Sequence, residues 1–277
     1  MAKDELDREL LEEMEEDAAA GLGHVEMENR EWAGFLLPGL DYDAQLHAIR
    51  EEIKNKRNRE QIALKRIENA EKIPKDSIRS TWDQIQAEDE FLDSCELYTY
   101  QSAAHSASAT GMLAPFIESI FRKLGQTGPS HLEPANLPLN NLKRKNFSST
   151  EQFWDCTKYI ESERHKEDIA SGINQIGRHT GIFKRGQTKI ITALFKYRNF
   201  IFHNGIEWPP EKLKEFEKFI HDQNFPDRWF SQARSGDVPW FIFMTDEFID
   251  EVLDTAEIAL DGIGCLALKA MDSQSPQ

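Results

Sequence analysis

Apolar residues recur along this chain mostly at helical spacing. Residues 41–73 combine alternating charges with an intermittent apolar seam, and residues 248–271 carry a fuller apolar stripe. Spacings of three and four residues place such side chains on one face of a helix. The two seams consist of Leu46, Ile49, Ile53, Ile62, Leu64 and Ile67, and of Phe248, Ile249, Val252, Leu253, Ala256, Leu260, Ile263, Ala267 and Leu268. Both segments are predicted to be helices.

Helix breakers and capping residues predict the remaining elements. Pro74 ends the first helix, and Asp76 or Ser77 can cap another that runs to residue 124 with a bend near Ser94 or Tyr98. Further helices are predicted at residues 151–164, 166–176, 190–203 and 210–223, with a connector at 21–40 and a loop at 128–149. The dense apolar run at 238–244 indicates a short strand or an extended segment that seals the core, and Thr245 is the predicted cap of the last helix.

These elements predict an all-α fold. We expect an acidic N-terminal segment and a charge-rich helical extension at residues 1–90, a helical domain at 91–271 and a disordered tail at 272–277. The extension has little apolar surface to bury by itself. It therefore packs against the main bundle or a second chain, or it forms an arm that binds a protein partner.

The helix at residues 190–203 carries an unusual arginine. Thr188 is its predicted N-cap, and Gly205 provides the left-handed conformation that ends many helices. The apolar arc of this helix consists of Ile190, Ile191, Leu194, Phe195, Ile201 and Phe202. Arg198 projects from near the middle of that arc. A guanidinium is almost never buried unpaired, so Arg198 requires a carboxylate such as Glu118, a second subunit or a bound phosphate.

Two further polar residues share a face of the same helix. Asn199 and His203 are four residues apart, so the amide can contact and orient the imidazole. Arg198 and His203 are about 140° apart in an unbroken helix. One phosphate reaches both only if the last turn bends or the arginine extends fully, or if the site is a composite at a two-fold interface.

The local charge around this helix is opposite to that of the whole protein. The 277-residue chain has a formal net charge of −16, yet residues 169–206 contain no Asp or Glu and six Lys or Arg residues. Such a run favours an anionic ligand, and Lys184, Arg185, Lys189 and Lys196 are the predicted RNA-binding residues. Tyr197, Phe200 and Trp208 are either available to stack on bases or, as is more usual for aromatic residues at helical spacing, part of the core.

A histidine and an arginine suit RNA cleavage by the 2′-hydroxyl, because one moves a proton near neutral pH and the other stabilises phosphate charge. The motif Arg198-Asn199-x-x-x-His203 resembles the R-x4-6-H signature of the HEPN superfamily (higher eukaryotes and prokaryotes nucleotide-binding). The helix at residues 98–124, rich in small side chains, resembles the opening helix of HEPN bundles, and the resemblance covers roughly residues 92–271.

The resemblance implies a metal-independent endoribonuclease that acts as a homodimer, with a role in toxin systems or antiphage defence. It implies that Arg198, Asn199 and His203 are the catalytic residues. HEPN toxins that are silenced through a nucleotidyltransferase partner carry a tyrosine two residues after the histidine. Gly205 occupies that position here, so this route of regulation is not expected.

Each of these assignments has a structural alternative. Arg198 can pair with Glu118, His203 can simply interact with the C-terminus of its helix, and the basic run can be solvated surface. His105 lies among alanines and serines and is either packed between helices or a supporting residue of the site. The alternative function is a non-catalytic HEPN scaffold for dimerisation, nucleotide binding or protein binding.

Composition and motifs exclude several other classes. Residues 1–17 hold nine acids and two bases and do not resemble a signal peptide, and no run of eighteen apolar residues is present, so a cytoplasmic protein without a membrane segment is expected. The three cysteines predict neither a disulfide framework nor a zinc pair. Phosphate-loop, dinucleotide and metalloprotease motifs are absent and the eight histidines are scattered, so no cofactor or metal site is predicted.

Overall fold

The computed structural model describes residues 29–71, 81–132, 153–161, 164–235 and 238–274 of the chain. Within these ranges most residues are helical, and the strands form two separate two-stranded sheets. The prediction of an all-α fold is therefore confirmed. The predicted helix in residues 1–17, the predicted caps at residues 76 and 77 and most of the predicted loop at 128–149 lie outside the described residues.

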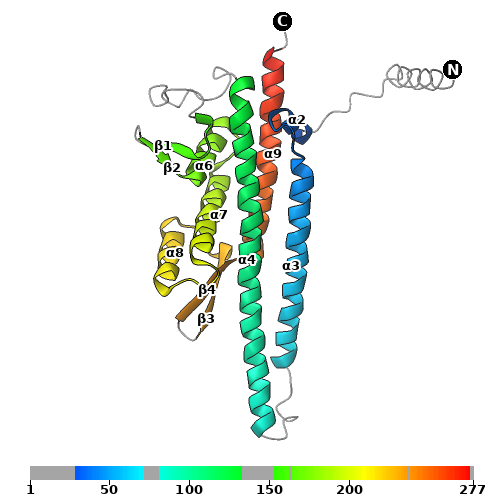
Figure 1. The fold of residues 1–277 in the computed structure, drawn as a ribbon, viewed down its shortest axis with the longest axis vertical. Coiled ribbons are helices and arrows are strands. Elements are labelled where there is room, and N and C mark those ends of the chain that lie inside the picture. The colour runs from blue at the N-terminus through cyan, green and yellow to red at the C-terminus, as the bar shows by residue number, and fades with distance from the viewer. Residues whose placement is uncertain (1–28, 72–80, 133–152, 162–163, 236–237, 275–277) are drawn as a thin grey trace, which may run out of the picture.

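Three long helices form the body of the molecule. Helices α3 (Tyr42–Glu71), α4 (Thr81–His131) and α9 (Asp246–Gln274) run side by side, and α4 extends furthest toward the lower end in Figure 1. The helix predicted for residues 41–73 is confirmed by α3. Helix α4 continues without a break through Ser94 and Tyr98 and past residue 124. Beyond that point the hydroxyl of Thr127 contacts the carbonyl of Lys123 in α4 and that of Leu36 in α2, which ties this end of α4 to α2.

The N-terminal elements share one core with the rest of the chain. Helix α2 (Asn29–Leu36) lies within the segment predicted as a connector, so that prediction was wrong for these residues. Contact with α9 stabilises this short helix: the Cα of Gly264 approaches the backbone of Asn29 so closely that a Cβ there would meet the carbonyl oxygen. The buried core includes Leu36, Leu46 and Ile53 together with residues of α4 and α9. The expected boundary between residues 90 and 91 falls inside α4.

A small hairpin replaces one predicted helix. Strands β1 (Lys158–Glu161) and β2 (Arg164–Glu167) pair antiparallel, where the sequence had indicated a helix at residues 151–164. Helix α6 (Ile169–Thr180) begins after Asp168, whose carboxylate accepts a hydrogen bond from the backbone N–H of Ser171 at 3.3 Å. Gly172 of α6 lies so close to the backbone of Cys156 and Lys158 that there is no room for a side chain at this position. This contact positions the hairpin. Helix propensity did not predict it, because propensity reflects only local sequence.

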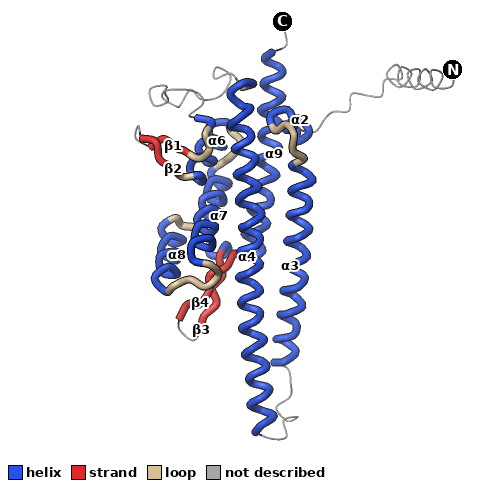
Figure 2. Tube along the Cα trace, viewed as in Figure 1, coloured by secondary structure: helices blue, strands red, loops and turns tan. Residues whose placement is uncertain are grey.

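A second hairpin precedes the last helix. Strand β4 (Val238–Met244) confirms the predicted extended segment, and it pairs with β3 (Phe230–Ser235), which the sequence did not indicate. Figure 2 shows this hairpin between α8 and the lower part of α4. The strand register shifts at Ala233 and Arg234, opposite Pro239, which has no N–H for the ladder. Thr245 caps α9 as predicted, because its hydroxyl accepts the N–H of Phe248 at 3.2 Å.

Aromatic side chains hold α8 (Pro210–Asp222) and β3 against α7 (Arg185–Asn204). Phe216 is at the centre of this cluster, and its ring lies 5.0 to 5.7 Å from those of Phe200, Trp208, Phe230 and Tyr197. Tyr197, Phe200 and Trp208 are all buried, so they belong to the core and are not available to stack on RNA bases. The hydroxyl of Tyr197 donates to the carbonyl of Ile242 at 3.0 Å, and burial raises its pKa. The predicted helix at 210–223 is confirmed by α8.

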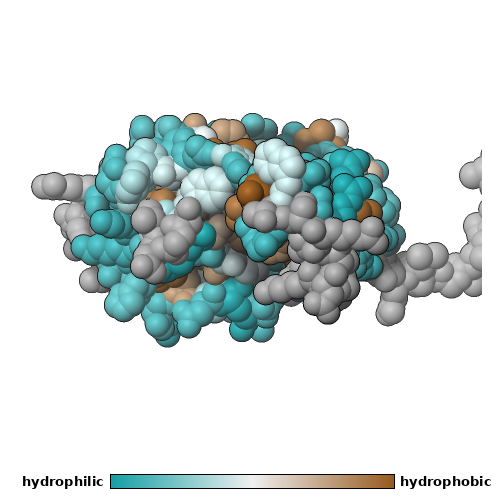
Figure 3. Space-filling model, turned by 90° about the horizontal axis from the view of Figure 1, so that it is seen from below, coloured by the Kyte–Doolittle hydropathy of each residue, from teal (hydrophilic) through white to brown (hydrophobic). Residues whose placement is uncertain are grey.

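The surface is largely hydrophilic. Seen from the lower end, hydrophobic atoms form separate patches among hydrophilic ones (Figure 3). In the described part of the chain, no helix is both long and apolar enough to cross a membrane.

Cys95, Cys156 and Cys265 are free thiols. Helix α9 extends to Gln274, so it includes the first residues of the expected tail, and residues 275–277 lie outside the description.

Candidate functional site

Helix α7 is longer than the sequence indicated. It begins at Arg185, after Lys184 rather than after Thr188, and the side-chain oxygen of Gln187 accepts the backbone N–H of Lys184 at 3.1 Å, which is one half of a capping box. Gly205 ends the helix as predicted and has a positive φ of +76°, but its ψ of −157° lies outside the left-handed helical conformation that was expected. Its N–H donates to the carbonyl of Ile201 at 2.8 Å, the ordinary helical spacing. The helix is thus regular to its end, and the bent last turn considered for the motif is not present.

One face of α7 is polar along its whole length. At about 100° per residue, seven side chains fall within a sector of about 100°. They are Arg185, Thr188, Lys189, Thr192, Lys196, Asn199 and His203, which we call the α7 polar stripe. All seven are exposed or half-buried. The stripe therefore joins three of the four predicted RNA-binding residues to two of the three predicted catalytic residues on one accessible face.

The N-terminal half of the stripe borders a cavity of about 510 Å³. Helix α6 forms the opposite wall with Asn174 and Arg178, and the end of α8 closes one side. Arg178, Arg185 and Lys189 supply positive charge, and no acidic residue is among the described residues that line the cavity. These features make the cavity a suitable binding place for an anionic group.

Asn174 gives the cavity hydrogen-bonding specificity. Its amide nitrogen donates to the carbonyl of Thr188 and to the hydroxyl of Thr192, both at 3.0 Å. Its amide oxygen is buried and has no hydrogen-bond partner among the described residues. A buried acceptor without a donor is costly, so a ligand that offers an O–H or N–H beside its negative charge would be favoured. A nucleotide has both kinds of group.

Two other titratable groups near the cavity are constrained. Burial, with a smaller contribution from the charge of Arg178, lowers the pKa of His179, so its imidazole is neutral at physiological pH. The ammonium of Lys189 donates to the carbonyl of Asn224 at 3.1 Å, which fixes this lysine against the loop after α8.

Arg178 was part of the acid-free run in the sequence but was not among the predicted RNA-binding residues, and Asn174 was missed entirely.

The other predicted RNA-binding residues differ in their surroundings. Lys184 is exposed at the N-cap of α7 and does not line the cavity. The ammonium of Lys196 lies 5.0 Å from the ring centroid of Phe200 and 5.1 Å from that of Phe219, within cation–π range. Lys196 therefore covers the edge of the aromatic core while it contributes charge to the stripe.

Arg198 lies on a different face of α7, toward α4. Its guanidinium Nη2 is 3.8 Å from a carboxylate oxygen of Glu118, the contact considered as the structural alternative. Arg122 binds the other oxygen of Glu118 at 2.7 Å and is the closer partner. The guanidinium also lies 5.9 and 5.6 Å from the rings of Phe195 and Phe202. About 30% of the Arg198 side chain remains exposed, so a further anion can reach it.

His203 and Asn199 share the stripe but are not hydrogen-bonded to each other. Both side chains are exposed. In a regular helix Arg198 is directed about 140° away from His203, so one chain does not present both groups to a single phosphate. The structure thus brings His203 and Asn199 together with the basic stripe and separates Arg198 from them within the monomer.

Comparisons of this chain with protein-family models, with curated proteins and with solved structures found no match. The HEPN resemblance consequently rests on the motif residues and on their position at the end of a helix.

Proposed function

We propose that this protein binds RNA along the α7 polar stripe and cleaves it without a metal ion, as an endoribonuclease of HEPN type. The observation that carries the proposal is the stripe itself, on which three cations, two hydroxyls, an amide and a histidine share one face in a protein of net charge −16. Phosphates are attracted to this face, and the acidic remainder of the chain disfavours broad RNA binding.

The stripe suits a short single-stranded segment. From Lys189 at the cavity to His203 the helix rises by about 21 Å at 1.5 Å per residue. The cavity would take a nucleotide, with its phosphate near Arg185 and Lys189 and a hydroxyl or base N–H donating to the amide oxygen of Asn174. Single strands expose these groups, whereas duplex RNA buries its base edges.

His203 is the proposed proton-transfer residue. In the reaction the 2′-oxygen forms a bond to the adjacent phosphorus, the bond to the 5′-oxygen breaks, and a proton moves from the 2′-hydroxyl to solvent or a base while the leaving oxygen gains one. An imidazole in this position can donate a proton to the leaving oxygen or accept one from the 2′-hydroxyl. Asn199 would orient the imidazole or the phosphate.

Arg198 would stabilise the phosphorane charge from a second subunit. The angle between Arg198 and His203 in one chain supports a composite site in a homodimer. Exposed apolar side chains support the same idea: Phe202, beside Arg198, is 64% exposed, and Trp82, Leu92 and Leu97 are exposed on the projecting end of α4. Large apolar side chains left exposed are typical of interfaces between chains.

The first experiment is incubation of purified protein with a mixed tRNA and mRNA pool in excess EDTA, followed by sequencing of the cleaved ends. We expect 2′,3′-cyclic phosphate termini, or 3′-phosphates after their hydrolysis, together with 5′-hydroxyl ends, because attack by the 2′-hydroxyl breaks the bond between phosphorus and the 5′-oxygen. Cleavage that appears only when Mg²⁺ or Mn²⁺ is supplied, or that leaves 5′-phosphate and 3′-hydroxyl ends, would contradict the proposed chemistry.

The composite site predicts complementation between two inactive variants. A heterodimer of Arg198→Ala and His203→Ala chains regains one intact site of two, since each chain supplies the residue that its partner lacks. Co-expression in equal amounts is therefore expected to restore about a quarter of wild-type activity, because half of the dimers are mixed. Activity at the level of the separate variants would show that both residues act from one chain or that the dimer is not the active form.

A second candidate function is a non-catalytic scaffold. The contacts of Arg198 with Glu118, Phe195 and Phe202 favour it, because they give the arginine a structural role. On this hypothesis the Arg198→Ala variant loses stability or dimerisation, while no RNA is cleaved by the wild type.

A further inference from the structure

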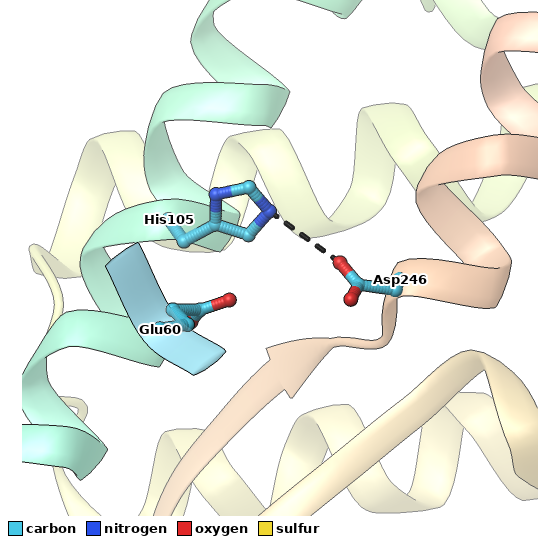
Figure 4. A group of neighbouring side chains, drawn as sticks. All are labelled: Glu60, His105 and Asp246. Carbon is cyan, nitrogen blue, oxygen red and sulfur yellow. Dashed lines mark ion pairs between the residues drawn. The ribbon is translucent and has the colours of Figure 1, made fainter. Parts of the chain in front are cut away.

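Three side chains from distant parts of the sequence converge beside the long helices, away from the α7 polar stripe. Glu60 comes from α3, His105 from α4, and Asp246 is the first residue of α9. One potential ligand atom of each lies within 4.8 Å of the others, as Figure 4 shows. His105 is buried, with 4% of its surface exposed, and it faces the two carboxylates.

The imidazole of His105 lacks hydrogen bonds. Neither ring nitrogen has a hydrogen-bond partner among the described residues. Nε2 makes an ion-pair contact with a carboxylate oxygen of Asp246 at 3.6 Å, a distance that is too long for a hydrogen bond. Buried polar atoms in proteins nearly always have a partner, so the orphaned ring points to a ligand that occupies the space between these groups.

We propose that Glu60, His105 and Asp246 bind a divalent transition-metal ion, with zinc as the best match. Imidazole nitrogen and carboxylate oxygen are both ligand types that zinc accepts, and three protein ligands leave a fourth position for water. In a tetrahedral zinc site with bonds of about 2.0–2.1 Å, neighbouring ligand atoms are about 3.4 Å apart. The His105 to Asp246 distance of 3.6 Å is close to this value, and small rotations of the Glu60 side chain would bring its oxygen in.

The charges around the cluster are compatible with a cation. The Glu60 carboxylate is half-buried beside that of Asp246, and a cation between the two would offset the repulsion of their negative charges. Arg57 of α3 donates to one oxygen of Asp246 at 2.7 Å and also binds Asp250 of α9 at 2.8 Å. This Oδ1 is also the Asp246 oxygen that lies 3.6 Å from His105, so the metal would use its remaining lone pair, and Asp246 and Asp250 balance the charge of the arginine.

A metal at this position would connect α3 to α4 and α9. It would hold the charge-rich N-terminal helix, which has few apolar residues in its C-terminal half, against the body of the protein. Binding that is confined to the folded state stabilises that state. The proposed metal therefore has a structural role, and it is independent of the RNA-cleaving residues on α7.

The test uses full-length protein, stripped with EDTA and dialysed, and titrated with Zn²⁺ alone. We expect one zinc ion per chain by calorimetry and elemental analysis, and a rise in Tm of about 5 °C at saturation. Cobalt(II) in place of zinc should give the visible absorption of a tetrahedral site. The variants Glu60→Gln and His105→Asn are expected to lower the zinc affinity at least about 100-fold, the size of loss expected from removal of one ligand.

The matched control is His47→Asn, which alters an exposed histidine of α3 and leaves the cluster intact. Cys95, Cys156 and Cys265 are present in every variant, so zinc binding by thiols would be unchanged by the substitutions. The inference is overturned if wild type binds no zinc, or if both cluster variants bind it as tightly as wild type. Circular dichroism identifies a variant that has not folded, and Glu60→Gln, which keeps the size of the side chain, then decides the outcome.

Discussion

Replacing His203 with alanine is expected to lower the rate of RNA cleavage by about 10²- to 10⁴-fold, the usual contribution of a general acid or base. The side chain is exposed on the α7 polar stripe and supports no packing, so the helical circular-dichroism spectrum and the unfolding midpoint should stay at wild-type values. RNA affinity should change little, because Arg185 and Lys189 supply the phosphate contacts near the cavity. The measurements are initial cleavage rates on a defined single-stranded substrate and binding by fluorescence anisotropy.

His221→Ala is the matched control for this prediction. His221 lies in the last turn of α8, as His203 lies in the last turn of α7, and its side chain is 92% exposed. His221 lies outside the stripe, so the His221→Ala variant should cleave RNA at the wild-type rate. If His203→Ala also cleaves at the wild-type rate, the assignment of the proton-transfer residue is wrong. If both variants lose activity equally, the loss reflects surface histidines in general and not a catalytic site.

Replacing Phe216 with alanine is expected to lower the free energy of unfolding by about 3–5 kcal/mol. Phe216 is fully buried, and its ring contacts Tyr197, Phe200, Trp208 and Phe230. Truncation leaves a cavity in a cluster of rigid rings, which cannot collapse easily to fill it. Urea unfolding followed by circular dichroism measures the change, which should appear as a lower midpoint with little change in slope.

Phe202→Ala provides the comparison for the packing argument. Phe202 is the same residue type and lies 64% exposed on α7, so at a protein concentration that keeps the chain monomeric its removal should change the stability by less than about 0.5 kcal/mol. The Phe216 cluster also holds the C-terminal half of α7 against α8 and β3. A loss of less than about 1 kcal/mol for Phe216→Ala would mean that α8 is not required to hold the helix that carries His203.

Local sequence signals predicted much of the helical framework. Helix α3, the capping hydroxyl of Thr245 and the end of α7 at Gly205 are each determined within a few residues, because helical spacing, caps and turns are short-range features. The C-terminal half of the predicted α3 seam was wrong as a buried face, because Ile62 and Leu64 are exposed. The hairpins and α2 were not predicted. Their stability depends on contacts such as Gly172 against Cys156 and Gly264 against Asn29, which join residues far apart in the chain.

The candidate site likewise has one part that the sequence predicts and one part that depends on tertiary contacts. Helical periodicity alone places Arg185, Lys189, Asn199 and His203 on one face of α7 and turns Arg198 away, since a regular helix fixes the angle between neighbours. Only the tertiary structure brings Asn174 and Arg178 of α6 to the other side of the cavity and Glu118 of α4 next to Arg198.

The sequence by itself determined the helical class of this protein and the polar face of α7, because both follow from spacings of three and four residues. The tertiary structure decided the cavity, the partner of Arg198 and the convergence of Glu60, His105 and Asp246. The packing of whole helices determines which distant side chains meet, and no local pattern encodes that packing.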